Sequence, residues 1–228
     1  MTIAERIQEI QRLIAQTAER YQRKSETIHL LAVSKGQSAA AIQDAFQAGL
    51  TNFGENYLQE ARIKMQILST LPICWHFIGP IQSNKTQSIA QHFSWVHSIG
   101  REEIALRLAK QRPLELPPLN ICLQVNLDNE DSKSGIHPEQ LAKLASLVNQ
   151  LPQLTLRGLM TIPKPQTTEQ LQYESLLRLT KLFNTLNKEL NLSMDTLSMG
   201  MSDDLRAAIH AGSTMVRIGR ALFGERQG

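Results

Sequence analysis

The chain alternates between short apolar runs and longer amphipathic segments along its whole length. The first clear run extends from Ile28 to Val33 and stops abruptly at Ser34 and Lys35. A run that is apolar on both faces is typical of a strand in a parallel sheet covered by helices. We therefore predict a buried strand over 28–34, with Lys35 at its carboxyl end.

An amphipathic helix is predicted in front of this strand, over 2–22. Thr2 and Glu5 have the spacing of a capping box, in which each side chain accepts a hydrogen bond from the other residue's backbone. Isoleucines then recur at helical spacing, which places them on one face, at Ile3, Ile7, Ile10 and Ile14.

The order of strand and helix repeats along the rest of the chain. The second predicted strand is short and ends at 52–55. The later predicted strands cover 73–78, 95–98, 119–125, 154–160, 196–199 and 214–218. The first helix after the opening strand is predicted from about Ser38 to a stop at Gly49. A later helix begins at Pro138 and reaches Val148, and another runs from a capping box at Thr167 and Gln170 to Leu190. The other helices are predicted through 58–67, near 84–91, over 101–110 and near 203–211.

Strict alternation of strand and helix requires a parallel sheet, and eight such units are the number that closes a barrel. The predicted fold class is α/β, a single (β/α)8 TIM barrel with an extra N-terminal helix. An open doubly wound sheet is the alternative, but no glycine fingerprint follows the first strand. The chain stops ten residues after the last strand, so we expect 1–24 to supply the final covering helix and 1–228 to form one domain.

Composition narrows the classes of protein that suit this fold. Of the 228 residues 42% are hydrophobic, and 24 basic against 21 acidic side chains give a net charge of +3 without charged blocks. A nucleic-acid-binding protein is not expected, because such proteins concentrate Lys and Arg on one face. Neither a membrane-spanning run nor a signal peptide is recognised, so we expect a cytoplasmic protein. Cys74 and Cys122 are expected to be reduced thiols, and the six histidines have no metal-binding spacing.

Candidate chemistry gathers where the predicted strands end. In such barrels the site lies at the C-terminal ends of the strands, and phosphate is often held by the loops after strands seven and eight. Those loops are 198–204 and 217–220, where glycines allow close approach and Ser202 can offer a hydroxyl and an amide at a helix start. The alternative is that Ser202 is an ordinary N-cap, with Asp203 and Asp204 interacting with the helix dipole.

Lys35 ends the first strand at the same edge, and barrel closure places it next to Arg217 at the end of the eighth strand. Apolar walls and a fixed cation favour the neutral amine of a lysine, which is the form that makes a Schiff base. A solvated lysine at a strand end is the alternative. Together with the phosphate loops, the arrangement indicates a pyridoxal 5′-phosphate (PLP) site.

Motifs found along nearly the whole chain occur together in one known family. They are LAVSK at 31–35, FGENY at 53–57, WHFIG at 75–79, QSNK at 82–85, SKSG at 132–135, GLMTIP at 158–163, LSMGMS at 197–202, GST at 212–214 and RIG at 217–219. With these motifs the chain resembles the pyridoxal phosphate homeostasis proteins.

The resemblance implies a barrel like the N-terminal domain of bacterial alanine racemase, with PLP bound at the strand ends. It implies that Lys35 is the Schiff-base lysine and that Arg217 contacts the pyridine nitrogen. It further implies that Ser202 and the Gly219 backbone hold the phosphate. The other implied contacts to the cofactor are Asn56 and Met201. Ser213 and Thr214 are further candidates for the rim. Because a guanidinium donates a hydrogen bond but keeps its proton, Arg217 would leave the ring a poor electron sink.

Three hypotheses about function remain. The first is a protein that holds PLP as a Schiff base and helps to balance its cellular supply without turnover, with PLP-dependent apo-enzymes as candidate partners. The second, less expected, is an amino-acid racemase or related enzyme, since alanine racemase takes one base from a second domain for which the chain has no room. The third is a phosphate-binding barrel without a Schiff base.

Other polar residues are expected to be structural. His76 and His97 are expected to be hydrogen-bonded core residues and not bases. Lys133 is expected to be a solvated loop residue, with a second cationic contact for an anion at the mouth as the alternative. Tyr57 suits packing as well as a site, and Met199 and Met201 are expected to line the wall of the site and not to act as catalysts. The absence of the second racemase domain also favours a monomer.

Overall fold

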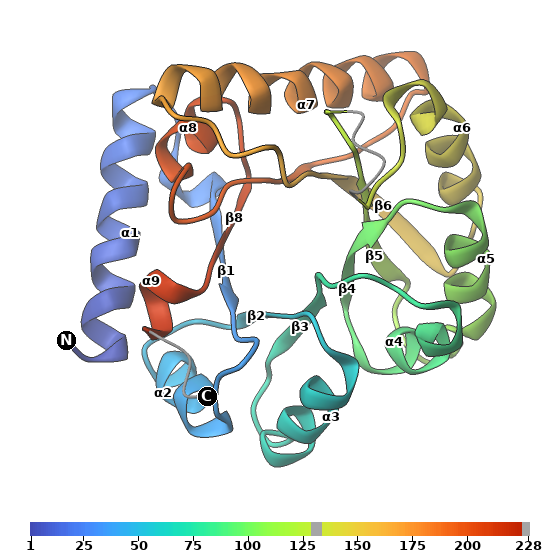
Figure 1. The fold of residues 1–228 in the computed structure, drawn as a ribbon. Coiled ribbons are helices and arrows are strands. Elements are labelled where there is room, and N and C mark those ends of the chain that lie inside the picture. Colours follow the sequence, from blue (N-terminus) through green and yellow to red (C-terminus); the bar gives the residue numbers. More distant parts are fainter. Residues whose placement is uncertain (129–133, 225–228) are drawn as a thin grey trace.

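The strands form a closed parallel barrel in the computed structural model, which describes residues 1–128 and 134–224 (Figure 1). Each strand pairs with the next along the chain, and the last pairs with the first. The strands are β1 (His29–Val33), β2 (Asn52–Glu55), β3 (Cys74–Phe77), β4 (Trp95–Ile99), β5 (Leu119–Gln124), β6 (Leu154–Met160), β7 (Thr196–Ser198) and β8 (Met215–Ile218). The predicted (β/α)8 barrel is confirmed.

Helices cover the outside of this barrel (Figure 1). They are α1 (Ile3–Arg20), α2 (Ala39–Gln47), α3 (Leu58–Ile67), α4 (Thr86–His92), α5 (Glu102–Gln111), α6 (Pro138–Asn149), α7 (Glu169–Glu189), α8 (Leu205–His210) and α9 (Arg220–Phe223), with 3-10 turns at Ser25–Thr27 and Ser83–Lys85. Apolar residues between sheet and helices make the main core.

The N-terminal helix completes the ring of helices, as predicted. The capping box of Thr2 and Glu5 is present, and α1 buries Ile7, Ile10 and Ile14. This helix packs against α2, α8 and α9 (Figure 1), so it fills the position that the single turn of α9 is too short to cover. The burial of these isoleucines stabilises the closed ring by the removal of apolar surface from water.

Several helices begin one or two residues later than predicted, among them α4, which starts at Thr86 after the 3-10 turn at Ser83–Lys85. The predicted capping box at Thr167 is wrong, because the neighbouring Thr168 has the extended backbone of an N-cap and accepts from the Leu171 amide at 3.3 Å. Helix α8 begins at Leu205, since the Asp204 carboxylate holds the preceding residues in a turn.

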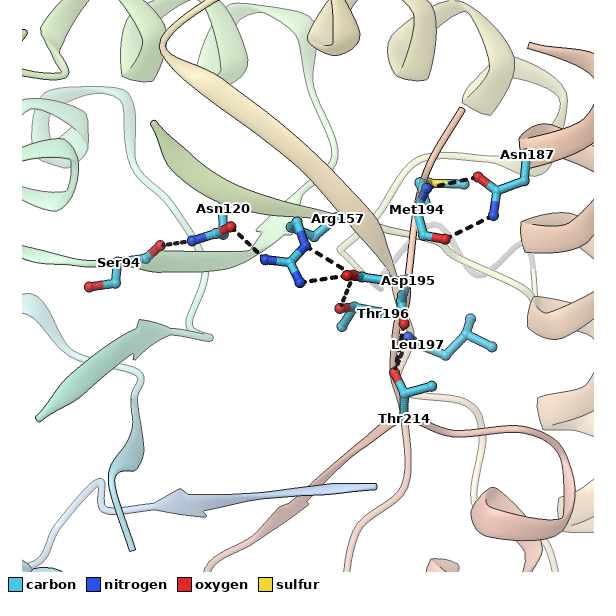
Figure 2. A network of polar contacts seen from close by, with 9 residues as sticks. All are labelled: Ser94, Asn120, Arg157, Asn187, Met194, Asp195, Thr196, Leu197 and Thr214. Atoms are coloured by element: carbon cyan, nitrogen blue, oxygen red, sulfur yellow. Dashed lines mark hydrogen bonds and ion pairs between the residues drawn. The ribbon is translucent and has the colours of Figure 1, made fainter. Parts of the chain in front are cut away.

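A polar network links neighbouring strands near the end of the barrel at which the strands start (Figure 2). Arg157 donates to both carboxylate oxygens of Asp195 at 2.9 and 2.6 Å and to Asn120 Oδ1 at 3.0 Å. Its guanidinium carbon lies 4.8 Å from the centre of the Trp95 ring. This end is therefore stabilised by contacts between strands, and the opposite end, at which the strands finish and which we call the mouth, carries the candidate site.

Both cysteines are free thiols, and burial raises the pKa of Cys74 and of Cys122, which keeps the thiols protonated and unreactive. Among the residues that the structure describes, no helix combines the length and apolar character that crossing a membrane requires. In the same residues no three His, Cys, Asp or Glu side chains are grouped as a metal site.

Candidate functional site

The mouth brings the ends of β1 and β8 side by side. The two strands pair in parallel, and Leu31 lies directly opposite Arg217. Lys35 lies half-buried in the turn after β1. The predicted proximity of the ends of the first and last strands is therefore correct, and the candidate Schiff-base lysine follows the strand next to the one that carries Arg217.

Arg217 is buried and held by the neighbouring strands. One terminal nitrogen donates to the Ser198 carbonyl oxygen and to Ser198 Oγ, the latter at 2.9 Å, and the other donates to the Thr161 carbonyl oxygen at 2.9 Å. Burial lowers the pKa of Arg217 to about 10, while the nearby Asp204 carboxylate opposes this shift. The guanidinium thus stays charged at neutral pH, and its position is fixed by β7 and the end of β6.

A chain of hydrogen bonds continues from Arg217 across the barrel interior. Ser198 Oγ lies 2.8 Å from His97 Nδ1, His97 Nε2 lies 2.9 Å from His76 Nδ1, and His76 Nε2 lies 3.0 Å from Asn52 Oδ1. Because Asn52 Oδ1 can only accept, each neutral imidazole donates from Nε2, and the Ser198 hydroxyl, which accepts from Arg217, donates its hydrogen to His97 Nδ1. Burial lowers the pKa of His76 to about 3 and that of His97 well below its ordinary value.

This chain confirms the two histidines as hydrogen-bonded core residues. The sequence did not reveal that they support Arg217, because His97 stands on β4 and Ser198 on β7, and only barrel closure brings them together. The signal that could have found them is the alternation of inward positions along each strand.

The loop after β7 approaches Arg217 through its backbone. The Gly200 carbonyl oxygen accepts from the Arg217 amide at 2.9 Å, and the Met201 amide donates to Asp204 Oδ1 at 2.6 Å. Gly200 has φ +96°, and a Cβ there would lie 2.4 Å from the Cβ of Ala208, so only glycine suits this close turn.

Ser202 lies exposed in the turn before α8 and is not its N-cap, so that alternative is wrong. Asp204 takes the cap position. Burial raises the pKa of Asp204, while the Met201 amide and the Arg217 charge favour its ionised form. Met201 is 39% exposed at the end of the barrel where Ser202 also lies.

Asn56 and Gly219 lie at the ends of the strands on either side of β1. Asn56 follows β2, and its Oδ1 is a buried acceptor without a hydrogen-bond partner among the residues that the structure describes. Gly219 follows β8, where a Cβ would lie 3.2 Å from the Val33 carbonyl oxygen. The backbone after β8 thus passes close to the end of β1, and an unused acceptor lies at the end of β2.

Other predicted candidates lie elsewhere. Ser213 and Thr214 precede β8 and bond to the backbone around β7, so their prediction as rim residues is wrong. Tyr57 is 61% exposed, whereas Met199 is buried as predicted for wall. Lys133 lies outside the described residues.

The fold and the mouth define a barrel of the kind found at the start of alanine racemases. The family model described as "Alanine racemase, N-terminal domain" matches residues 7–227. Alanine racemase from Corynebacterium glutamicum superposes with a TM-score of 0.73 at 15% identity, covering 99% of this chain and 61% of the racemase chain, which is a likeness of fold.

Nearer relatives refine this class. A pyridoxal phosphate homeostasis protein from Pseudomonas aeruginosa is 57% identical over 99% of this chain and 96% of its own length, and that of Escherichia coli strain K12 is 49% identical over 98% and 97%. PipY of Synechococcus elongatus, solved with PLP bound, has a TM-score of 0.86 at 35% identity, covering 98% of this chain and all of PipY. The chain belongs to the pyridoxal phosphate homeostasis protein family.

Proposed function

We propose that this chain binds PLP reversibly and takes part in balancing its supply in the cell. One observation carries the proposal. The half-buried Lys35 follows β1, and the buried, charged Arg217 lies near the end of the neighbouring strand β8, so both residues lie at the same mouth. The relative solved with PLP and the relatives named for PLP homeostasis support it.

The side chains around the mouth suit the groups of this cofactor. Lys35 would supply the amine for a Schiff base with the aldehyde carbon, whose oxygen would leave as water. Arg217 donates to the ring nitrogen. Asn56 Oδ1, the buried acceptor without a partner in the described residues, accepts from a hydroxyl of the ring.

Ser202 and the Gly219 backbone would hold the phosphate. Ser202 has an exposed hydroxyl, and the Gly219 backbone has no Cβ to keep an anion at a distance. Met201, between Gly200 and Ser202, covers the ring with an adaptable apolar side chain.

Arg217 restricts the chemistry of the bound cofactor. PLP supplies an electron sink for amino-acid carbanions, and that sink is strongest when the ring nitrogen carries a proton. The Arg217 guanidinium keeps its proton at neutral pH and offers only a hydrogen bond. We therefore propose that the chain holds the cofactor without turnover.

The test begins with absorption spectra of the purified protein with added PLP, followed by borohydride reduction and peptide mapping. We expect a visible Schiff-base band and a reduced adduct on Lys35. Lys35→Ala should lack both, and Lys24→Ala, which removes an exposed lysine, should keep both. A wild-type protein without the band would favour the third hypothesis, a phosphate-binding barrel.

Incubation with single L-amino acids and chiral analysis then separates the carrier from a racemase. Measurable D-amino acid formed by wild-type protein but not by Lys35→Ala would contradict the proposal. We also propose a monomer in the cytoplasm that gives PLP to apo-enzymes. Size-exclusion chromatography with and without an apo-enzyme, combined with recovery of that enzyme's activity, tests this part.

A further inference from the structure

A cluster of three charged side chains lies against the turn that carries Lys35. Glu55 ends β2, and Glu60 and Lys64 stand on α3, so the cluster lies between the barrel and its helices. Glu55 is fully buried, and the side chain of Lys64 is only 7% exposed. The cluster lies outside the interior chain that holds Arg217 and shares no residue with it.

Lys64 uses every donor that it has. Its ammonium donates to Glu55 Oε1 at 2.7 Å, to Glu60 Oε1 at 2.6 Å and to the Ser34 carbonyl oxygen at 2.7 Å. An ammonium has three hydrogens, so these three acceptors saturate it and fix its position. The Ser34 hydroxyl adds a further bond to Glu55 Oε1 at 2.6 Å.

The cluster holds the two peptide groups that flank the Lys35 Cα. The carbonyl of the peptide before it belongs to Ser34 and accepts from Lys64, and the amide of the peptide after it belongs to Gly36 and donates to Glu60 Oε1 at 2.6 Å. Gly36 has φ +71°, the left-handed conformation that glycine adopts without strain. Contacts from α3 thus help to fix both peptides, together with the Gln37 amide, which donates to the Ser34 carbonyl at 3.0 Å, and they set the direction of the Lys35 Cα–Cβ bond.

A buried ion cluster is an inefficient way to stabilise a fold, because the cost of desolvation cancels much of the attraction. What it supplies is directional constraint on the groups it touches. We propose that Lys64 and Glu60 are positioning residues that aim the Lys35 amine at the aldehyde of the cofactor. The inference rests on the proposed function, since it assumes that Lys35 forms the Schiff base.

The test uses Glu60→Ala, because the Glu60 side chain is 29% exposed and its loss leaves the Glu55–Lys64 pair intact. Two ligands are compared, PLP and pyridoxine 5′-phosphate, which has the ring and phosphate but no aldehyde. We expect affinity for PLP to fall about tenfold, the value of one hydrogen bond to a charged group, with affinity for the analogue unchanged. Amide exchange at Gly36 should become faster at the same time.

Two further variants serve as rescue and control. Glu60→Gln keeps an acceptor for the Gly36 amide and should restore most of the PLP affinity. Glu103→Ala removes the same kind of helical pair, since Glu103 and Arg107 are also four residues apart in the first turns of a helix, and it should behave as wild type.

The outcomes separate the two proposals. An equal loss of affinity for both ligands, or unchanged PLP affinity with a rapidly exchanging Gly36 amide, would overturn the positioning role and leave PLP binding standing. If the wild-type protein binds both ligands equally and borohydride gives no reduced adduct on Lys35, the proposed function and the positioning role are overturned together.

Discussion

The two buried histidines predict how stability responds to acid. His76 is fully buried within the chain between His97 and Asn52, and burial lowers its pKa to about 3. In the unfolded chain the imidazole returns to its ordinary pKa of about 6.5. Between these values the unfolded state binds a proton that the folded state does not, so stability is complete above about pH 6.5 and is lost as pH falls towards about 3.

The magnitude follows from these two pKa values. Each pH unit well below 6.5 costs about 1.4 kcal/mol for one histidine, so acidification from about pH 7.5 to about pH 5 removes about 2 kcal/mol through His76 alone. This loss is a large share of the free energy of unfolding of a typical domain, about 5–15 kcal/mol. Carboxyl groups also titrate in acid, so a variant is needed to isolate the histidine.

The assay is urea unfolding followed by circular dichroism at several pH values, for wild type and His76→Gln. The amide of glutamine offers a donor and an acceptor but does not titrate in this range. We expect the variant to be less stable at pH 7.5 and to lose about 2 kcal/mol less than wild type on acidification. His92→Gln, at an exposed position of α4, should follow wild type. Equal losses in wild type and His76→Gln would refute the reasoning.

Three further predictions concern stability measured by the same unfolding assay. Gly200→Ala should cost about 2–4 kcal/mol, because the added Cβ meets Ala208, whereas Gly49→Ala, at φ +98° with open space around it, should cost only about 1 kcal/mol. Arg112→Met should cost about 3–5 kcal/mol, because this buried side chain donates to three backbone carbonyls. Arg157→Met should cost about 1 kcal/mol and leave PLP affinity unchanged, since its ion pair is partly exposed at the end opposite the mouth.

The fold could be predicted because each unit carries its own signal. Apolar runs such as 119–125 are strands in any topology, and their alternation with amphipathic segments leaves few arrangements besides a barrel. Local choices between equivalent residues were harder. Thr167 and Thr168 are both suitable caps, and sequence alone does not decide which one adopts the extended backbone that receives the Leu171 amide.

The candidate site could be predicted only as far as strand order reaches. Lys35 and Arg217 follow from the rule that the first and last strands of a barrel are neighbours. Their supports do not follow from it, because Ser198 and His97 meet across the interior and Lys64 reaches Ser34 from a helix. Such contacts depend on which side chains meet once the barrel is closed. Alternation along a strand indicates which residues face inward, but it does not pair them across the barrel.

Arg217 and the turn that carries Lys35 are held from opposite faces of the same sheet. Arg217 is fixed from inside by Ser198 and the neutral histidines, and the Lys35 turn is fixed from outside by the cluster of Lys64 and its two glutamates. Because no residue belongs to both supports, each can be altered while the other keeps its geometry. A loss in the inner chain should therefore appear chiefly in stability and at the ring nitrogen. A loss in the outer cluster should appear in Schiff-base formation by Lys35. The inner support therefore acts on binding of the cofactor ring, and the outer support acts on reaction with the aldehyde.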